Sequence, residues 1–345
     1  MSNTPIRVGV IGAGGNTIRH HIPKLQAQEG VEVVSVCNRS RESSERVAKQ
    51  FNIPTVYDDW QALVNADDTN AIVIGTWPYM HCPITLATLA ADKHVMCEAR
   101  MAMNASQAHA MRDASRTKPH LIAQIVPSPM SLGVDTTVRR LIAEGYLGDI
   151  VAINTVAHTG NFAEKTGELG WRHNMVYSGL NIMGMGIWYE ALLRWVGEAT
   201  QVMAMGKTVT KMRKNADGNL EGVKIPDHID IVATMACGAQ AHFQISAVTG
   251  IDKYSGITLF GTEGTLQFTQ GKLFGGQKGD DALSEIAIPD DEKAEWRVEE
   301  EFVGAIRGLE PIRLTDFDTG VKYMEFTEAV TRSMTSQQVV SLPLL

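Results

Sequence analysis

The sequence predicts an α/β protein in which a doubly wound parallel sheet is followed by an α/β domain with a large, mostly antiparallel, open-faced sheet. Three observations predict this fold. An apolar strand, 7–11, runs directly into a glycine-rich turn, and strands and helices then alternate at short intervals up to residue 125. After Pro127 the pattern changes to strand-like runs separated by turns. We therefore expect two domains, residues 1–125 and 126–345.

The first domain is predicted from strands and helices in strict alternation. The expected strands are 7–11, 31–36, 53–57, 71–76, 94–98 and 121–125, and the expected helices are 18–25, 58–64, 83–91 and 106–116. Parallel strands need such helical connections.

The second domain is predicted to carry a sheet with helices on one face. The expected strands are 150–156, 202–205, 229–235, 241–245, 257–260 and 265–268, with helices at 136–144, 295–307 and 319–334 and a surface excursion at 271–291. An open sheet face often becomes a subunit interface, so we expect a homo-oligomer, a dimer or a tetramer, formed through this sheet.

Composition and charge exclude several classes of partner. The formal net charge of −8 disfavours nucleic acid and anionic membranes, and no apolar run is long enough to span a membrane. The first residues do not resemble a signal peptide, and the four cysteines show no paired spacing, so a cytoplasmic protein is expected. No carboxylate or histidine cluster has ligand spacing, so no metal is expected.

The glycine turn predicts a dinucleotide-binding site. Gly12, Gly14 and Gly15 follow the first strand and precede a helix, and a second strand follows on schedule. Glycines there allow backbone N–H groups to approach a pyrophosphate. Thr17 stands where the usual pattern has a third glycine, which alters helix–strand packing more than phosphate contact.

The end of the second strand favours NADP(H) as cofactor. An acidic residue there commonly holds the ribose 2′-hydroxyl of NAD, but this chain has Asn38, and Arg39 or Arg41 can pair with a 2′-phosphate. Alternatively, Arg39 only stacks on the adenine and NAD binds as well. The expected cofactor-binding residues are Gly12, Gly14, Gly15, Asn16, Asn38, Arg39, Ser40, Thr76, Trp77, His81 and Glu98.

Several motifs together resemble one known family. They are VGVIGAGG (8–15), GTWPYMHCPITLATLAADKHVMCEARMA (75–102), RRLIAEGYLGDIVA (139–152), WRHNMVYSG (171–179), LLRWVG (192–197), ITLFGTEGTLQF (257–268) and EEFVGAIRGLEPIRLT (300–315). The chain resembles the glucose-fructose oxidoreductase / inositol dehydrogenase / MocA (Gfo/Idh/MocA) family over nearly its whole length. The resemblance implies a Rossmann domain, an open-sheet domain and an NAD(P)-dependent enzyme that oxidises or reduces a hydroxyl or ketone of a sugar, glycoside or cyclitol.

The chain departs from the family pattern at its catalytic positions. The family's Glu-Lys-Pro appears here as Glu98-Ala99-Arg100, so the glutamate expected at the nicotinamide ribose is present and the lysine is absent. The family's aspartate and histidine align with Gly184 and Trp188. Fold and cofactor therefore transfer from the resemblance, and catalytic roles do not.

Three residues are candidates for the missing proton chemistry. Tyr189 can act as acid or base if its pKa is lowered, His173 titrates in the useful range, and Arg100 supplies fixed positive charge. Each has a structural alternative: a core aromatic, a solvated loop histidine or a surface charge. The predicted substrate-binding residues are Trp171, Arg172, Asn181 and Trp188.

Three functions remain open at this point. The leading hypothesis is an NADP(H)-preferring oxidoreductase acting on a carbohydrate-like alcohol or ketone. The second is a redox-neutral enzyme that cleaves a glycoside by oxidation, elimination and reduction on a retained nucleotide. The third is a non-catalytic nucleotide-binding protein.

Overall fold

The chain folds into two compact units. The computed structural model describes residues 5–164 and 167–344. One unit contains the described residues up to Pro127 together with Arg297–Val321, and the other contains Ser128–Trp296 and the residues from Lys322 onward.

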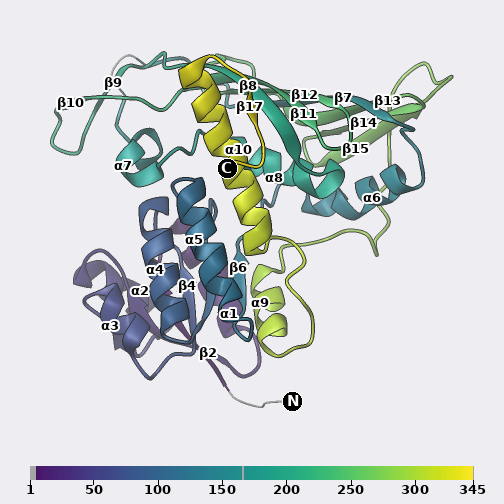
Figure 1. The fold of residues 1–345 in the computed structure, drawn as a ribbon. Coiled ribbons are helices and arrows are strands. Elements are labelled where there is room, and N and C mark those ends of the chain that lie inside the picture. Colours follow the sequence, from purple (N-terminus) through teal and green to yellow (C-terminus); the bar gives the residue numbers. More distant parts are fainter. Residues whose placement is uncertain (1–4, 165–166, 345) are drawn as a thin grey trace. The chain divides into compact units, whose positions relative to one another are not determined.

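The first unit is built on a six-stranded parallel sheet (Figure 1). Its strands are β1 (Ile6–Ile11), β2 (Val31–Cys37), β3 (Thr55–Val56), β4 (Ala71–Ile74), β5 (His94–Cys97) and β6 (Ala123–Ile125). They lie in the order β3-β2-β1-β4-β5-β6, and every pairing is parallel. This is the doubly wound order of dinucleotide-binding domains, and it confirms the predicted fold of this half.

Helices connect the parallel strands. They are η1 (Thr17–His21), α1 (Ile22–Gln26), α2 (Arg41–Phe51), α3 (Trp60–Asn65), α4 (Pro78–Ala90) and α5 (Ala105–Arg116). The helix predicted at 83–91 starts earlier, at Pro78. A proline fits the first turn of a helix, because the N–H that it lacks would have no partner within the helix there. The helix then continues through Pro83.

A late segment of the chain returns to the first unit, which differs from the predicted division at residue 125. Helix α9 (Val298–Ile306) contacts α1, Gln124 donates to Glu301 Oε2 at 3.0 Å, and the N–H of Ile125 donates to the carbonyl of Thr315 at 3.0 Å. These contacts join residues far apart in sequence, so local patterning gave no sign of them.

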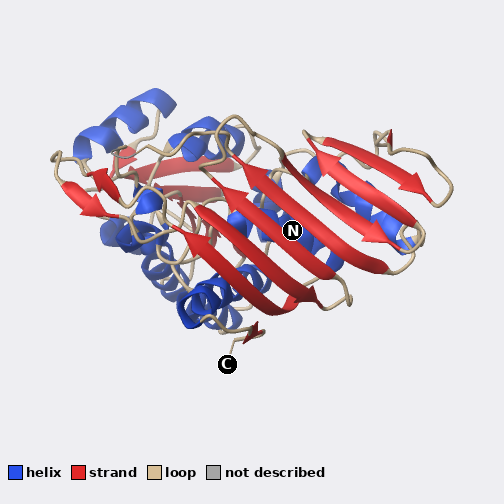
Figure 2. Cartoon of the chain, turned by 90° about the horizontal axis from the view of Figure 1, so that it is seen from above, coloured by secondary structure: helices blue, strands red, loops and turns tan. Residues whose placement is uncertain are grey.

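The second unit carries a nine-stranded, mostly antiparallel sheet, as predicted (Figure 2). Its strands are β7 (Ile150–His158), β8 (Ala199–Lys207), β11 (His228–Met235), β12 (Gln240–Ser246), β13 (Ser255–Gly261), β14 (Gly264–Thr269), β15 (Lys272–Gln277), β16 (Ser284–Glu285) and β17 (Val340–Ser341). Their order is β16-β15-β14-β13-β7-β12-β11-β8-β17, in which only β7 and β12 run parallel. A separate ribbon pairs β9 (Met212–Lys214) with β10 (Leu220–Gly222).

The predicted surface excursion at 271–291 is wrong in its first part. Residues 272–277 form β15, which pairs with β14 and buries Leu273, and β16 pairs with β15. The polar and glycine-rich composition of this edge hid its one buried apolar position.

Helices cover one face of this sheet. They are α6 (Leu132–Ala143), α8 (Met185–Val196) and the part of α10 (Phe317–Ser336) that belongs to this unit; the short helices η2 (Trp171–His173) and α7 (Met175–Ser178) precede α8 in the chain. Aromatic contacts fix α8: Tyr189 stacks on Phe326 of α10 with ring centroids 3.7 Å apart, and Trp195 meets Phe268 of β14 edge-on. The core of the unit lies between these helices and the sheet.

The opposite face of the sheet carries exposed apolar side chains. Met203, Met205 and Val232 are 46%, 75% and 55% exposed, and the register places Met203 beside Val232 on neighbouring strands. Association of two or more chains through this face stays a prediction.

The described part of the chain contains no helix that is long and apolar enough to cross a membrane. Among the same residues, no group of three or more histidine, cysteine and acidic side chains is arranged to hold a metal ion.

Candidate active site

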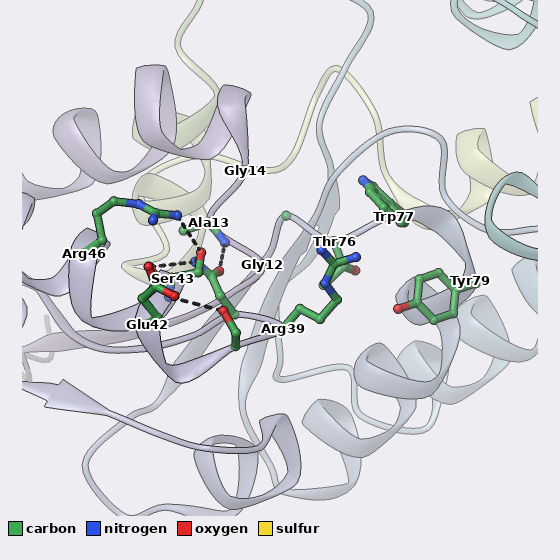
Figure 3. A pocket seen from close by; sticks show the side chains of 13 residues that line it. Gly12, Ala13, Gly14, Arg39, Glu42, Ser43, Arg46, Thr76, Trp77 and Tyr79 are labelled. Carbon is green, nitrogen blue, oxygen red and sulfur yellow. Dashed lines mark hydrogen bonds between the residues drawn. The ribbon is translucent and has the colours of Figure 1, made fainter. Parts of the chain in front are cut away.

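A cavity of about 440 Å³ opens at the carboxyl ends of β1, β2 and β4 (Figure 3). Ligands of doubly wound sheets bind at this edge, and the volume is in the range of small-molecule sites. The lining residues are Gly12, Ala13, Gly14, Asn38, Arg39, Ser40, Glu42, Ser43, Arg46, Gly75, Thr76, Trp77 and Tyr79. Seven of the residues predicted to bind a cofactor are therefore brought together: Gly12, Gly14, Asn38, Arg39, Ser40, Thr76 and Trp77.

The glycine turn forms the floor of this cavity and fits a dinucleotide. Gly12 has a φ of +83°, and a Cβ atom there would lie 2.6 Å from Thr76 Cγ2, so no other residue fits without strain. A Cβ at Gly14 would meet its first neighbour at 3.7 Å, and one at Gly15 would meet nothing within 4 Å. The backbone at Gly14 and Gly15 is thus open to a pyrophosphate.

The replacement of the third glycine by Thr17 is accommodated on the strand side. A Cβ on Gly75, at the end of β4, would lie 2.1 Å from Thr17 Oγ1 and 2.4 Å from the carbonyl oxygen of Gly12. Thr17 is buried, and η1 begins at this residue. The close helix–strand approach usually provided by a helix glycine is therefore provided here by Gly75.

Asn38 holds the turn in place. Its Oδ1 accepts a hydrogen bond from the N–H of Ala13 at 2.6 Å, and its Nδ2 donates to Ser43 Oγ at 3.0 Å. The side chain therefore links the glycine turn to the first turn of α2. A neutral amide at this position adds no negative charge to the cavity.

Two arginines and one carboxylate face the cavity from this side. Arg39 and Arg46 both line it, and Arg46 donates to Ser43 Oγ at 3.3 Å; Figure 3 shows Arg46 beside Ser43. Glu42 lines the same cavity. Arg46 was not predicted as a cofactor-binding residue, because helix α2 was not predicted. Had the helix been recognised, the spacing of three residues would have placed Arg46 on the same face as Ser43.

Arg41, the other arginine considered for a 2′-phosphate, is engaged elsewhere. Its guanidinium lies 2.8 Å from Glu45 and 2.8 Å from Asp58, and the side chain is exposed. Of the two predicted alternatives, only Arg39 lines the cavity.

Four predicted cofactor residues lie outside the cavity lining: Gly15, Asn16, His81 and Glu98. His81 corrects the prediction of a direct contact, because it is fully buried and its ring nitrogens lie 2.9 Å from the carbonyl oxygens of Thr76 and Arg100. Through these two contacts His81 links the segment after β4 to the segment after β5, and so supports Thr76 in the cavity lining. Glu98 follows β5 directly, and its carboxylate accepts from the side chain of Asn16 and from the N–H of Ala99.

Two family models match the chain. The model for the oxidoreductase family with an NAD-binding Rossmann fold matches residues 6–124, and that for the GFO/IDH/MocA C-terminal domain matches residues 136–267. The chain belongs to the GFO/IDH/MocA family. This confirms the resemblance found in the sequence.

Two of the relatives with known names are a glucoside dehydrogenase and a levoglucosan dehydrogenase. D-glucoside 3-dehydrogenase of Escherichia coli (strain K12) is 28% identical over 171 residues, which is 50% of this chain and 47% of that protein. Levoglucosan dehydrogenase of Pseudarthrobacter phenanthrenivorans is 24% identical over 249 residues, or 68% of this chain and 64% of that protein. The chain thus covers less than two thirds of either relative in these alignments.

Solved structures share the fold over the full length. An oxidoreductase domain protein from Kribbella flavida has a TM-score of 0.86 at 20% identity, covering 99% of this chain and 100% of that one. Levoglucosan dehydrogenase in complex with NADH and L-sorbose has a TM-score of 0.86 at 19% identity, covering 98% and 99%.

The second unit of this family member places Tyr189 in the core, as the structural alternative expected, and its pKa is not lowered as an acid–base role would require. The side chain is 1% exposed, and its hydroxyl oxygen accepts a hydrogen bond from the N–H of Ala199 at 2.8 Å. Burial raises the pKa of Tyr189 well above its ordinary value. Tyr189 is a structural residue that ties α8 to the start of β8.

Asn181, predicted to bind the substrate, is also buried in the second unit. It is 1% exposed, and its side-chain amide donates to the carbonyl of Ser178 at 2.7 Å, which closes the turn before α8. Glu190, the residue after Tyr189, is buried, and its carboxylate lies 2.9 Å from the guanidinium of Arg194.

The two positions aligned with the family's aspartate and histidine form one packed pair. Gly184 precedes α8 and Trp188 lies one helical turn later, so that a Cβ on Gly184 would touch Trp188 Cδ1 at 3.5 Å. The indole is buried. An apolar ring therefore occupies the space beside the helix start, where a carboxylate side chain would project.

His173 is placed differently from the other candidates. It lies in η2, is partly buried, and its Nδ1 has no hydrogen-bond partner among the described residues. Burial and the positive charges of Arg213 and Arg172 lower the pKa of His173 below its ordinary value. Its neighbours Trp171 and Arg172 form a cation–π pair at 4.2 Å. Arg100 is 4% exposed, so the predicted surface alternative does not hold for it.

Removing the hydroxyl of Tyr189 separates its structural role from a catalytic one. We expect Tyr189→Phe to lower the free energy of unfolding by about 1–3 kcal/mol, because the buried N–H of Ala199 loses its acceptor. Thermal or denaturant melting measures this loss, and the pH dependence of turnover should not change. Unchanged stability with abolished turnover would restore Tyr189 as a catalytic residue.

Proposed function

We propose that this protein is an NAD(P)-dependent oxidoreductase that acts on a hydroxyl or ketone of a sugar, glycoside or cyclitol-like molecule. The cavity floored by Gly12 and Gly14 in a family member carries the proposal. The names of its relatives, a D-glucoside dehydrogenase and a levoglucosan dehydrogenase, support the substrate class. The coenzyme would supply hydride transfer, and the chain supplies binding, orientation and proton transfer.

The experiment for this proposal is a substrate panel. The absorbance of reduced coenzyme is followed with glycosides, anhydrosugars, free sugars and cyclitols, in both reaction directions. Turnover of at least one of these classes supports the proposal. No turnover of any class by protein with bound coenzyme contradicts it.

A second candidate function, coenzyme binding without catalysis, is favoured by one observation. Tyr189, one of the predicted proton-transfer groups, is buried in the core. Gly184 and Trp188, which stand at the positions of the family's aspartate and histidine, have no titrating side chain. In the panel experiment this candidate predicts thermal stabilisation by coenzyme together with no turnover. The redox-neutral alternative instead predicts glycoside cleavage without net change in coenzyme absorbance.

We further propose that the coenzyme preferred is NADP(H). Arg39 and Arg46 line the cavity from the side where β2 ends, and two cations there suit a 2′-phosphate. Glu42 opposes this preference, because a carboxylate repels a phosphate and can accept from a ribose hydroxyl. The preference is therefore set by the balance of these three charges.

Charge substitutions test this balance. We expect Arg46→Ala and Arg39→Ala each to weaken NADPH binding about tenfold or more, the worth of one charged hydrogen bond, and to leave NADH binding nearly unchanged. Glu42→Gln should strengthen NADPH binding. Calorimetric titration measures each affinity, and Arg41→Ala is the matched control, because Arg41 pairs with Glu45 and Asp58. Equal losses for both coenzymes would contradict a 2′-phosphate site.

We also propose His173 as the group that moves the substrate proton. Because its pKa lies below the ordinary value, it is neutral at neutral pH and can accept a proton during alcohol oxidation. Oxidation should therefore speed up as pH rises through that lowered pKa and then level off.

Replacement of His173 tests this role. We expect His173→Gln to lower kcat for oxidation about 100-fold or more and to remove the acidic limb of its pH profile, with coenzyme affinity unchanged. His120→Gln is the control, because His120 is an exposed histidine beside Asp92. A His173→Gln variant with the parent's pH profile would exclude His173 as the base.

A further inference from the structure

We propose that His21 and Glu299 are positioning residues that hold the carboxylate of Glu98 in place as an acceptor for a hydroxyl group of the bound coenzyme. This inference rests on the proposed function, since it concerns how the coenzyme is held. Neither His21 nor Glu299 was selected from the sequence as a site residue.

The three side chains form a buried row. His21 Nδ1 lies 2.5 Å from Glu299 Oε1, and His21 Nε2 lies 3.0 Å from Glu98 Oε1. His21 and Glu299 have no exposed side-chain surface, whereas the Glu98 side chain is 15% exposed. The row is therefore closed at Glu299 and open only at Glu98, which stands where β5 ends.

The chemistry of the row requires a charged imidazole. Carboxylate oxygens only accept hydrogen bonds, so both ring nitrogens of His21 must donate. Burial alone would lower the pKa of His21, but the bonds to Glu299 and Glu98 outweigh it and raise the pKa to about 9. Burial alone would likewise raise the pKa of Glu98, and the bonds from His21 and Asn16 keep it below its ordinary value. Glu98 is thus held ionised.

The local backbone is shaped to bring His21 to this place. Residues Thr17–His21 form a π-helical turn, in which the N–H of Ile22 bonds to the carbonyl of Thr17. Such turns are rare and occur frequently at functional sites. The turn directly follows the glycines that floor the cavity, so the same short segment forms the turn and carries His21.

A purely structural role explains this arrangement poorly. Two carboxylates and an imidazolium are costly to bury, and apolar side chains of similar volume often serve stability as well or better. A functional role accounts for this free-energy cost, because the row leaves the carboxylate of Glu98 ionised, held by three hydrogen-bond donors and exposed on one side. Its Oε1 accepts from His21 and Asn16 and its Oε2 from the N–H of Ala99, so a second lone pair of Oε2 is left for a ligand hydroxyl.

The test compares coenzyme affinity with pH in the protein without substrate. The groups that face His21 are Glu98 after β5, Glu299 on α9 and Asn16 before η1, with the Lys24–Glu300 pair nearby at the surface. The dissociation constant of NADPH is measured by calorimetry from about pH 7.5, where the 2′-phosphate is fully ionised, to about pH 10, together with thermal melting. In the parent protein we expect constant affinity up to about pH 9 and a decline above it, because a neutral imidazole keeps a single N–H.

The variant Glu299→Gln keeps the volume and removes one charge. We expect its affinity to be about tenfold or more lower at neutral pH and to decline at a lower pH than in the parent, since His21 loses its proton sooner. Glu299→Asp should restore part of the affinity. Glu300→Gln, the neighbouring and partly exposed carboxylate, is the control and should match the parent.

A double-mutant cycle tests whether His21 acts through Glu98. His21→Gln should weaken coenzyme binding in the parent and have little further effect when combined with Glu98→Gln. The inference is overturned if Glu299→Gln and His21→Gln melt at lower temperature but bind NADPH with the parent's affinity at every pH. If the parent protein itself binds no coenzyme, the proposed function fails instead.

Discussion

The close approach of the first glycine turn to the end of β4 is the constraint on which the nucleotide site depends. Gly12 has a left-handed backbone conformation, and both Gly12 and Gly75 lack the Cβ that would collide with the opposite segment. This contact brings the ends of β1 and β4 together, and Asn38 fixes the end of β2 to the same turn through the N–H of Ala13. The contact thereby places the glycines, the two arginines Arg39 and Arg46, and Trp77 around one cavity.

Local sequence patterns were sufficient to predict the fold and the floor of the site. Apolar strands, helical spacing and glycines after the first strand are local signals, so the parallel sheet, the antiparallel sheet and the contact of Gly12, Asn38 and Thr76 with one cavity were predictable. The return of α9 to the first unit was not, because it depends on pairs such as Gln124 with Glu301. The row of Glu98, His21 and Glu299 was hidden for the same reason.

Burial explains why several residues predicted from the sequence as catalytic or substrate-binding have structural roles instead. A pattern in sequence shows that a tyrosine or asparagine stands near a helix start, but not whether its polar atom meets backbone or solvent. Tyr189 and Asn181 both bond to backbone groups inside the second unit, and Nδ1 of His173 is buried without a hydrogen-bond partner among the described residues. The start of α8 therefore provides packing in this chain, and the proton-transfer role of His173 in η2 stays a proposal.

The most direct measurement of the central claim is a calorimetric titration of the intact protein with NAD⁺, NADH, NADP⁺ and NADPH, repeated with a Gly12→Val variant. The account predicts saturable binding at one site per chain, tightest for a phosphorylated coenzyme, and loss of that binding when a side chain fills the contact between Gly12 and Thr76. Absence of heat and of thermal stabilisation with all four coenzymes, or equal binding by a folded Gly12→Val variant, would contradict it.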